Sequence, residues 1–166
     1  HVNNGLAVDY ADVAAKVGIA KARAWYQAYD AAVDTVARLV REEAIDCDFM
    51  RHGKLKLATR ANQMGALERS AQRLIDDGVD TEVEVLDATR VRSEVQSERF
   101  HGGLLYKRSG QMHMGRFAHG LATAAQRHGA QIHTGTAVER IERLGQGHAH
   151  RLHTARGTVT AQQVLL

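Results

Sequence analysis

The sequence predicts an α+β protein, because helical and strand-like patterns are mixed in it without a regular alternation of strand and helix. In the first third, apolar residues recur at steps of three and four, which is typical of helices. The middle interleaves short alternating stretches with further helical ones, and the part after about residue 130 consists of strand-like segments separated by turns. We therefore expect a sheet flanked by helices, followed by a small antiparallel meander.

Two helices are predicted in the first third. Asp9 is a suitable N-cap for a short helix that ends at Gly18, since acids favour the first position and glycine the position after the last turn. A longer helix follows to about Ala44. Its aromatic and aliphatic stripe is expected to face the core and consists of Trp25, Tyr29, Val33, Val36 and Val40.

A strand and a third helix follow. Residues 47–60 alternate, so that Lys54 and Lys56 point one way and Leu55 and Leu57 the other, as in a half-buried strand. Thr59 is a good N-cap for the next helix, which Gly78 ends. The apolar face of this helix is formed by Met64, Leu67, Ala71 and Leu74.

The next segment is expected to contain a strand, a short helix and a turn. Residues 81–87 alternate as a short strand, and Asp87 can cap a brief helix through Val95. Residues 100–115 hold two apolar stretches around the turn at Ser109 and Gly110, which indicates a hairpin or a paired loop.

The last third begins with a helix and continues as strands. Phe117, Leu121 and Ala125 mark a helix from about Gly115 to His128, which Gly129 closes. Turn signals at Gly135, Gly145 and Gly157 separate the segments that follow. The strands are expected at residues 130–134, 136–144, 149–155, 157–161 and 163–166.

Composition favours an ordinary globular protein. The 166 residues are 44% apolar and 25% charged, and no apolar run approaches the ~18 residues of a membrane span. The net charge of +3 comes from basic residues interleaved with acidic ones, which indicates a solvated surface rather than a nucleic-acid site. The single cysteine, Cys47, fits a reducing cytoplasm. Because Asp46 and Asp48 flank it, a buried structural thiol is favoured over a nucleophile.

Local motifs do not define a catalytic or metal site. Residues 145–150 begin like a dinucleotide fingerprint, but His150 replaces the third glycine and the segment joins two strands, so a hairpin turn is favoured. His148 and His150 have a spacing that a metal could use, yet no nearby cysteine or carboxylate completes a site, and no metal is predicted. His101 and His113 could each be a surface residue or a ligand contact, and the first interpretation is favoured.

The order of several motifs along the chain is more informative than any single motif. The chain contains Gly102-Gly103, then residues 110–113, then a helical stretch over residues 120–130, then residues 136–141. This order resembles the middle of FAD-dependent oxidoreductases of the D-amino acid oxidase family, which includes glycine and sarcosine oxidases and γ-glutamylputrescine oxidoreductase. Residues 45–74 also resemble the γ-glutamylputrescine oxidoreductase-like branch. Met114 departs from the pattern, because the family often has a proline there.

The resemblance implies two domains and an internal position in a longer enzyme. Residues 1–113 correspond to a substrate-domain-type sheet flanked by helices, and residues 114–166 to a helix plus part of the antiparallel β-meander of an FAD-binding domain. In the family, the strand that matches residues 161–166 runs on toward the flavin. We therefore expect an internal portion that is inactive by itself, retains no FAD and self-associates around residues 157–166.

The resemblance also implies a chemistry. The full-length parent would be an FAD-dependent oxidoreductase acting on CH–NH groups, with a small-molecule amine or amino acid as its substrate. Val138 matches a position whose main chain meets the adenine end of FAD, and Asn3 lies where the family's chain passes the isoalloxazine. An ordinary core valine and a turn residue are the alternatives, and no catalytic residue is assigned. A non-catalytic binding or interaction domain that shares the substrate-domain fold is the competing class, with a nucleic-acid module a more distant third.

Overall fold

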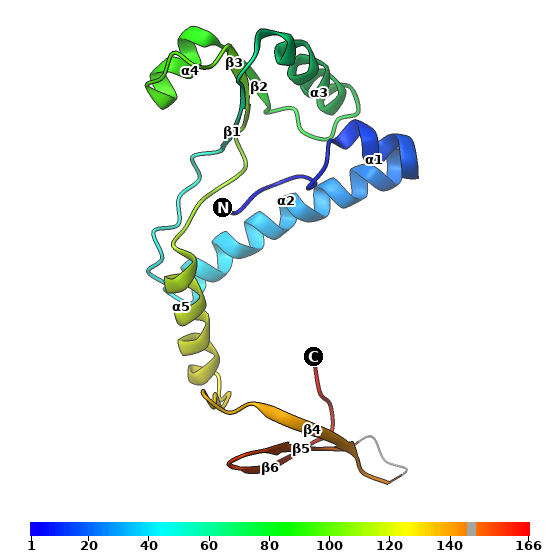
Figure 1. Cartoon of the computed structure of the whole chain (residues 1–166), viewed down its shortest axis with the longest axis vertical. Helices are drawn as coiled ribbons and strands as arrows, with labels where there is room; N and C mark the ends of the chain where they lie inside the picture. The colour runs from blue at the N-terminus through cyan, green and yellow to red at the C-terminus, as the bar shows by residue number, and fades with distance from the viewer. Residues whose placement is uncertain (146–148) are drawn as a thin grey trace. The chain divides into compact units, whose positions relative to one another are not determined.

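The computed structural model describes residues 1–145 and 149–166 and confirms the α+β class, with helices and antiparallel strands (Figure 1). The chain divides into two compact units, His1–Ala124 and Ala125–Leu166. This division falls downstream of the boundary expected after residue 113. The assignment of residues 1–113 and 114–166 to a substrate domain and part of an FAD domain therefore stays a prediction.

The first two helices begin and end where the sequence predicts. Helix α1 spans Tyr10–Val17, and the Asp9 carboxylate accepts a hydrogen bond from the Ala11 N–H at 2.9 Å. Gly18 separates it from α2 with a φ of 86°, a conformation that glycine adopts at little cost. Helix α2 spans Ile19–Glu42.

The buried face of α2 differs from the predicted stripe. Its buried residues are Ala22, Tyr26, Asp30 and Val33. Trp25 and Tyr29 are 43% and 51% exposed, so the prediction that they face the core is wrong. The predicted stripe and the buried one both have helical spacing. The buried one is harder to recognise in the sequence, because it includes the polar Asp30. Only the packing partners distinguish the two.

A three-stranded antiparallel sheet forms the centre of the first unit. Strand β3, Gly102–Tyr106, lies between β1, Lys54–Ala58, and β2, Glu84–Asp87. The β1–β3 register places Lys54 opposite Tyr106, Lys56 opposite Leu104 and Ala58 opposite Gly102.

The main core lies against the face of β1 that carries the lysines. Alternate residues of a strand share a face, so Lys54 and Lys56 share theirs with Ala58, which is fully buried. Ala58 and Leu104 pack in one cluster with side chains of α1, α2 and α3. The opposite face is covered as well, because α4 contacts β2 and β3, and Leu86 is 1% exposed. The predicted alternation is therefore confirmed, but leucines do not mark the core face.

Two helices lie on opposite sides of this sheet in Figure 1. Helix α3, Met64–Asp76, buries Leu67, Ala71 and Leu74 as predicted. A 3₁₀ turn, Ala61–Gln63, precedes it, so Thr59 is not its N-cap; the Gln63 side chain instead accepts a hydrogen bond from the Thr59 N–H at 2.8 Å. Helix α4, Ala88–Val95, is capped as predicted, since Asp87 accepts from the Arg90 N–H at 2.8 Å.

The segment after β3 is a paired loop rather than a hairpin. Gly110 pairs with Val2 through two backbone hydrogen bonds of 2.8 Å, and Gln111 pairs with Met50 through two of 2.9 Å. Strand β3 pairs only with β1 and β2 in the described structure, and both precede it in sequence. The hairpin interpretation is wrong because long-range partners take the place of the local one.

Helix α5, Met114–Arg127, agrees closely with the prediction, and Gly129 after it has a φ of 91°. Gly120 in this helix lies against Ile45, so closely that a Cβ atom there would be 2.3 Å from the Ile45 Cγ2. A glycine is thus required where the helix meets the segment that follows α2.

The second unit contains an antiparallel meander. Its strands are β4, Val138–Arg143, β5, His150–Thr154, and β6, Gly157–Ala161, in the order β4-β5-β6. The strands predicted at residues 130–134 and 163–166 do not form, because no described strand pairs with these segments. The predicted turn at residues 145–150 includes residues 146–148, which lie outside the described residues. No helix within residues 1–145 and 149–166 is both long and apolar enough to cross a bilayer.

Candidate functional site

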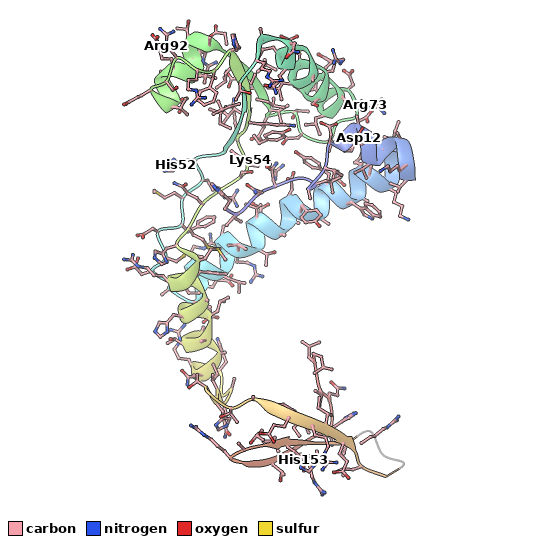
Figure 2. All side chains as sticks on the ribbon, in the orientation of Figure 1. Asp12, His52, Lys54, Arg73, Arg92 and His153 are labelled. Atoms are coloured by element: carbon pink, nitrogen blue, oxygen red, sulfur yellow. The ribbon has the colours of Figure 1, made fainter. Side chains whose placement is uncertain are left out.

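A small hollow in the first unit brings together side chains from parts of the chain that are distant in sequence. Its volume is about 320 Å³, and its walls come from the segment before α1, from α2, from α3 and from strands β1 and β3. Lys54 projects from β1 on the side of the N-terminal segment (Figure 2). We call this cavity the lysine–tyrosine hollow; its polar lining includes Asn4, Asp9, Tyr26, Lys54, Lys56 and Tyr106.

Lys54 and Tyr106 form a pair across β1 and β3. The Lys54 ammonium lies 4.5 Å from the centroid of the Tyr106 ring, within the range of a cation–π contact. Burial lowers the pKa of Lys54, and the nearby charge of Lys56 lowers it further. Neither lysine forms an ion pair with a carboxylate in the described structure.

The Tyr106 hydroxyl is held in its neutral form. Burial raises the pKa of Tyr106 to about 12, and the negative charges of Asp9 and Asp80 contribute to the rise. Within the described residues this half-buried hydroxyl has no hydrogen-bond partner. It is therefore a free donor beside a cation.

A buried polar network fixes the N-terminal segment beside the hollow. The Asn4 amide donates to the Asp80 carboxylate at 3.1 Å and to the Tyr26 hydroxyl at 3.4 Å, and Tyr26 donates to the same Asp80 oxygen at 3.1 Å. The Ser109 hydroxyl donates to the Asn4 side-chain oxygen at 2.6 Å. Burial and the negative charge of Asp80 raise the pKa of Tyr26, which keeps this donor protonated. The network joins residues far apart in sequence, and sequence reasoning missed all of it.

A second hollow in the same unit is acidic. Its volume is about 390 Å³, and its lining includes Asp30, Asp34, Asp80, Glu82 and Arg108. Arg108 pairs with Asp30 at 3.4 Å and with Asp34 at 3.8 Å. Burial raises the pKa of Asp30, although the positive charge of Arg108 opposes the rise. Arg108 thus already neutralises part of this cluster.

The two residues proposed to contact FAD both lie at accessible positions. Asn3 is exposed between Val2, which pairs with Gly110, and the buried Asn4, and its amide has no partner among the described residues. Val138 begins the edge strand β4 and is 48% exposed. It lines a hollow of about 340 Å³ with apolar walls from Leu152 and Val159. Asn3 and Val138 belong to different units, so the structure describes each site separately.

The cysteine and the histidines considered in the sequence analysis show no sign of a catalytic or metal site among the described residues. Cys47 is 1% exposed, and burial together with Asp48 and Asp46 raises its pKa, as expected for a structural thiol. The His113 ring accepts a hydrogen bond from the Arg116 N–H at 3.2 Å at the start of α5. His101 is exposed, and its backbone N–H donates to Ala58. His148 lies outside the described residues, and among those described no three histidine, cysteine or acidic side chains could hold a metal.

A helix-flanked antiparallel sheet with a small hollow lined by polar and apolar side chains, followed by an antiparallel meander, defines an α+β protein. Comparison with known families gives a more specific assignment than the fold class. Residues 3–166 match the family described as FAD dependent oxidoreductase, DAO, and the chain belongs to this family. The predicted family resemblance is confirmed.

Individual relatives agree with this assignment. The chain is 29% identical over 133 residues to gamma-glutamylputrescine oxidoreductase of Escherichia coli K12, which covers 80% of this chain and 30% of that protein. The structure is similar to glycine oxidase from Geobacillus kaustophilus, with a TM-score of 0.67, 27% identity, and coverage of 80% of this chain and 36% of that one. Glycine oxidase from Bacillus cereus ATCC 14579 shares the fold, with a TM-score of 0.62, 19% identity, and coverage of 87% and 39%. The chain therefore spans well under half the length of these relatives.

The surroundings of Asn3 and of Val138 are each compatible with the contact to FAD that the sequence predicts for that residue. The exposed amide of Asn3 is free to hydrogen-bond, and the apolar hollow beside Val138 could receive a flat ring at the open edge of β4. The described strands pair only in antiparallel fashion, so they do not form the parallel β–α–β turn that cradles a dinucleotide pyrophosphate. The described residues therefore provide no such cradle for the phosphates of the cofactor.

Proposed function

We propose that the protein containing this sequence is an FAD-dependent oxidoreductase that acts on the CH–NH group of a small amine or amino acid. The observation that carries this proposal is the family match over residues 3–166. The names of two relatives support the substrate class. Glycine and γ-glutamylputrescine each contain a carbon that bears hydrogen and an amino nitrogen.

The residues of this chain would hold the cofactor and shape its surroundings. The Asn3 amide would contact the isoalloxazine side of FAD, and the main chain of Val138 would contact the adenine end. The bound flavin would supply the acceptor for the hydride that leaves the C–H next to the substrate nitrogen, and water would hydrolyse the imine product. The Asn4–Tyr26–Asp80 network would hold the backbone next to Asn3 in one position, since each of these groups is buried and hydrogen-bonded.

The single cysteine supports a cytoplasmic location for this enzyme. Cys47 is free and buried, and one cysteine offers no intramolecular disulfide. Proteins of oxidising compartments commonly rely on such bonds.

The test uses the product of the reading frame that encodes this sequence, purified with its flavin and mixed anaerobically with candidate substrates. Glycine, sarcosine and γ-glutamylputrescine are compared with glycolate, in which a hydroxyl replaces the amine of glycine. At least one amine is expected to bleach the visible flavin absorbance, and deuterium on the carbon next to nitrogen should slow the bleaching. Reduction by glycolate but by none of the amines would contradict the proposal.

A further inference from the structure

We propose that Arg140, Glu142 and His153 form a pH-sensitive switch in the meander. In this switch the His153 ring accepts a hydrogen bond from Arg140 when it is neutral and donates one to Glu142 when it is protonated. Arg140 and Glu142 lie on β4, and His153 lies on the neighbouring strand β5 (Figure 2). The proposed function assigns no role to these residues, so the switch goes beyond it.

Two short contacts of the His153 ring meet at one nitrogen atom. Its Nε2 atom lies 2.9 Å from Nη2 of Arg140 and 3.0 Å from Oε2 of Glu142. A ring nitrogen of histidine carries either a lone pair or a hydrogen. With the lone pair it accepts from Arg140, which can only donate, and with the hydrogen it donates to the Glu142 carboxylate, which can only accept. The two hydrogen bonds therefore exclude each other.

The protonation of His153 selects between these hydrogen bonds. Histidine side chains change their charge between about pH 5 and 8, and the imidazolium has a hydrogen on both ring nitrogens. In that form Nε2 donates to Glu142, and the positive ring repels Arg140. A neutral ring with its hydrogen on Nδ1 instead accepts from Arg140, while Glu142 keeps its ion pair with Arg140 at 3.7 Å. This tautomer satisfies all three groups, so we expect it in the neutral state.

Two arginines and one carboxylate share the face of the sheet on which His153 lies. The register places Arg140 opposite His153 and Glu142 opposite Arg151, and alternate residues of a strand share a face. Strand β6 places Thr158 opposite His153 and carries no titratable side chain. The hydrogen bond to His153 and the charges of Arg140 and Arg151 hold the pKa of Glu142 below its ordinary value. Glu142 thus stays a carboxylate throughout the range in which histidine titrates.

The experiment follows the ring nitrogens of His153 and the guanidinium of Arg140 by NMR in the 166-residue chain, from about pH 5 to 8. At the upper end, the nitrogen shifts of the Nδ1–H tautomer are expected, with Nε2 as the acceptor. At the lower end, both ring nitrogens should be protonated. The guanidinium signals of Arg140 should shift in the same transition, because Arg140 loses its acceptor when the ring gains a proton.

Variants separate the two partners of the ring. Arg140→Met removes the donor, so the neutral ring should change to the Nε2–H tautomer and donate to Glu142. Glu142→Gln should keep the Nδ1–H tautomer, since Arg140 still donates to Nε2. Arg143→Met is the matched control, because it removes an arginine from the same strand at a position that pairs with His150 and faces the other side of the sheet. It should leave the tautomer unchanged.

Two results on the wild-type chain would overturn the proposed switch. One is an Nε2–H tautomer in the neutral ring, which would leave Arg140 without its acceptor. The other is a set of Arg140 signals that stays unchanged while His153 gains its proton. Because the chain is used without flavin, neither result depends on whether an amine reduces the flavin of the parent enzyme.

Discussion

At the scale of single residues, buried polar groups decide how the N-terminal segment is held. Asn4, Asp80 and Ser109 are each almost completely buried, and each has hydrogen-bond partners inside the unit. A buried carboxylate such as Asp80 depends on its donors, because water cannot replace them once they are removed. The Tyr26 hydroxyl is one of these donors.

Tyr26→Phe should therefore destabilise the chain by about 1–3 kcal/mol, since it leaves the buried Asp80 with one donor fewer. Tyr29→Phe is the matched control on the same helix, because Tyr29 is 51% exposed and has no hydrogen-bond partner among the described residues. Its effect should stay within about 0.5 kcal/mol. Urea unfolding measures both, and equal effects would show that the network contributes no stability.

Cys47 should be nearly inert in the folded chain. Its side chain is 1% exposed, and burial raises the pKa of the thiol, so the reactive thiolate is both scarce and covered. We predict that a thiol reagent labels the native chain at least ~100-fold more slowly than the chain in denaturant, since labelling requires an opening of the structure. Labelling at the same rate in both conditions would contradict this prediction.

At the scale of helices and strands, close contacts override local propensity. In an open helix, alanine is more stable than glycine by about 1 kcal/mol. At position 120 of α5, however, a Cβ would lie 2.3 Å from the Ile45 Cγ2 and 3.0 Å from its Cγ1. The effect of a substitution at position 120 on stability therefore depends on the packing between α5 and the residues after α2, and not on helix propensity.

Gly120→Ala is thus expected to destabilise the chain by about 1–3 kcal/mol, the usual cost of overpacking. Gly115→Ala in the same helix is the control, because the nearest neighbour of its added Cβ would be the exposed His113 ring at 3.3 Å, and it should be close to neutral. In an Ile45→Ala background, Gly120→Ala should cost less than in the wild type, because Ile45→Ala removes both the Cγ2 and the Cγ1 atom that a Cβ at position 120 would meet. Thermal unfolding of the variants tests this, and a stabilising Gly120→Ala would refute the contact.

At the scale of the whole molecule, the two units contribute differently to a flavoprotein. The first unit carries the helix-flanked sheet and the lysine–tyrosine hollow, and the second carries the meander with Val138. Both lie within the match to the FAD-dependent oxidoreductase family, but the described strands do not build a phosphate cradle. Contacts to the ends of a dinucleotide without its phosphates should bind it weakly.

We accordingly predict that the 166-residue chain purifies without FAD. The visible absorbance of the purified chain should show no flavin band, and equilibrium dialysis against added FAD should show little retention. A yellow protein, or stoichiometric retention in dialysis, would mean that other residues of this chain hold the phosphates.

The second unit is also expected to self-associate. Leu165 and Leu166 are fully exposed at 99% and 101%, and β6 is an edge strand whose Val159 is 55% exposed. Covering apolar surface gains roughly 25 cal/mol per Å², and an open edge offers unpaired backbone groups. Light scattering over a concentration series should show oligomers that a variant with Leu165→Lys and Leu166→Lys does not form. A wild-type chain that stays monomeric at high concentration would exclude this association.

Local signals in the sequence predicted the elements whose hydrogen bonds are satisfied within a few residues. Asp9 and Asp87 cap α1 and α4, and Gly18 and Gly129 follow the helices they were expected to end. The alternation in β1 was equally clear. The prediction of strands at residues 130–134 and 163–166 was wrong. A strand needs a neighbouring strand to pair with, and a local sequence pattern does not indicate whether one is present.

The sequence by itself therefore determined the fold class, the helices, the N-caps of α1 and α4, and, through the order of its motifs, the family. Only the tertiary structure decided which faces are buried and which side chains meet. Tyr26 rather than Trp25 enters the core, and Lys54 reaches Tyr106 because antiparallel pairing places β1 beside β3. The physical reason is the sequence separation of the residues that interact. A cap or a turn involves residues a few positions apart, whereas burial and the lysine–tyrosine hollow depend on contacts between segments far apart in the chain.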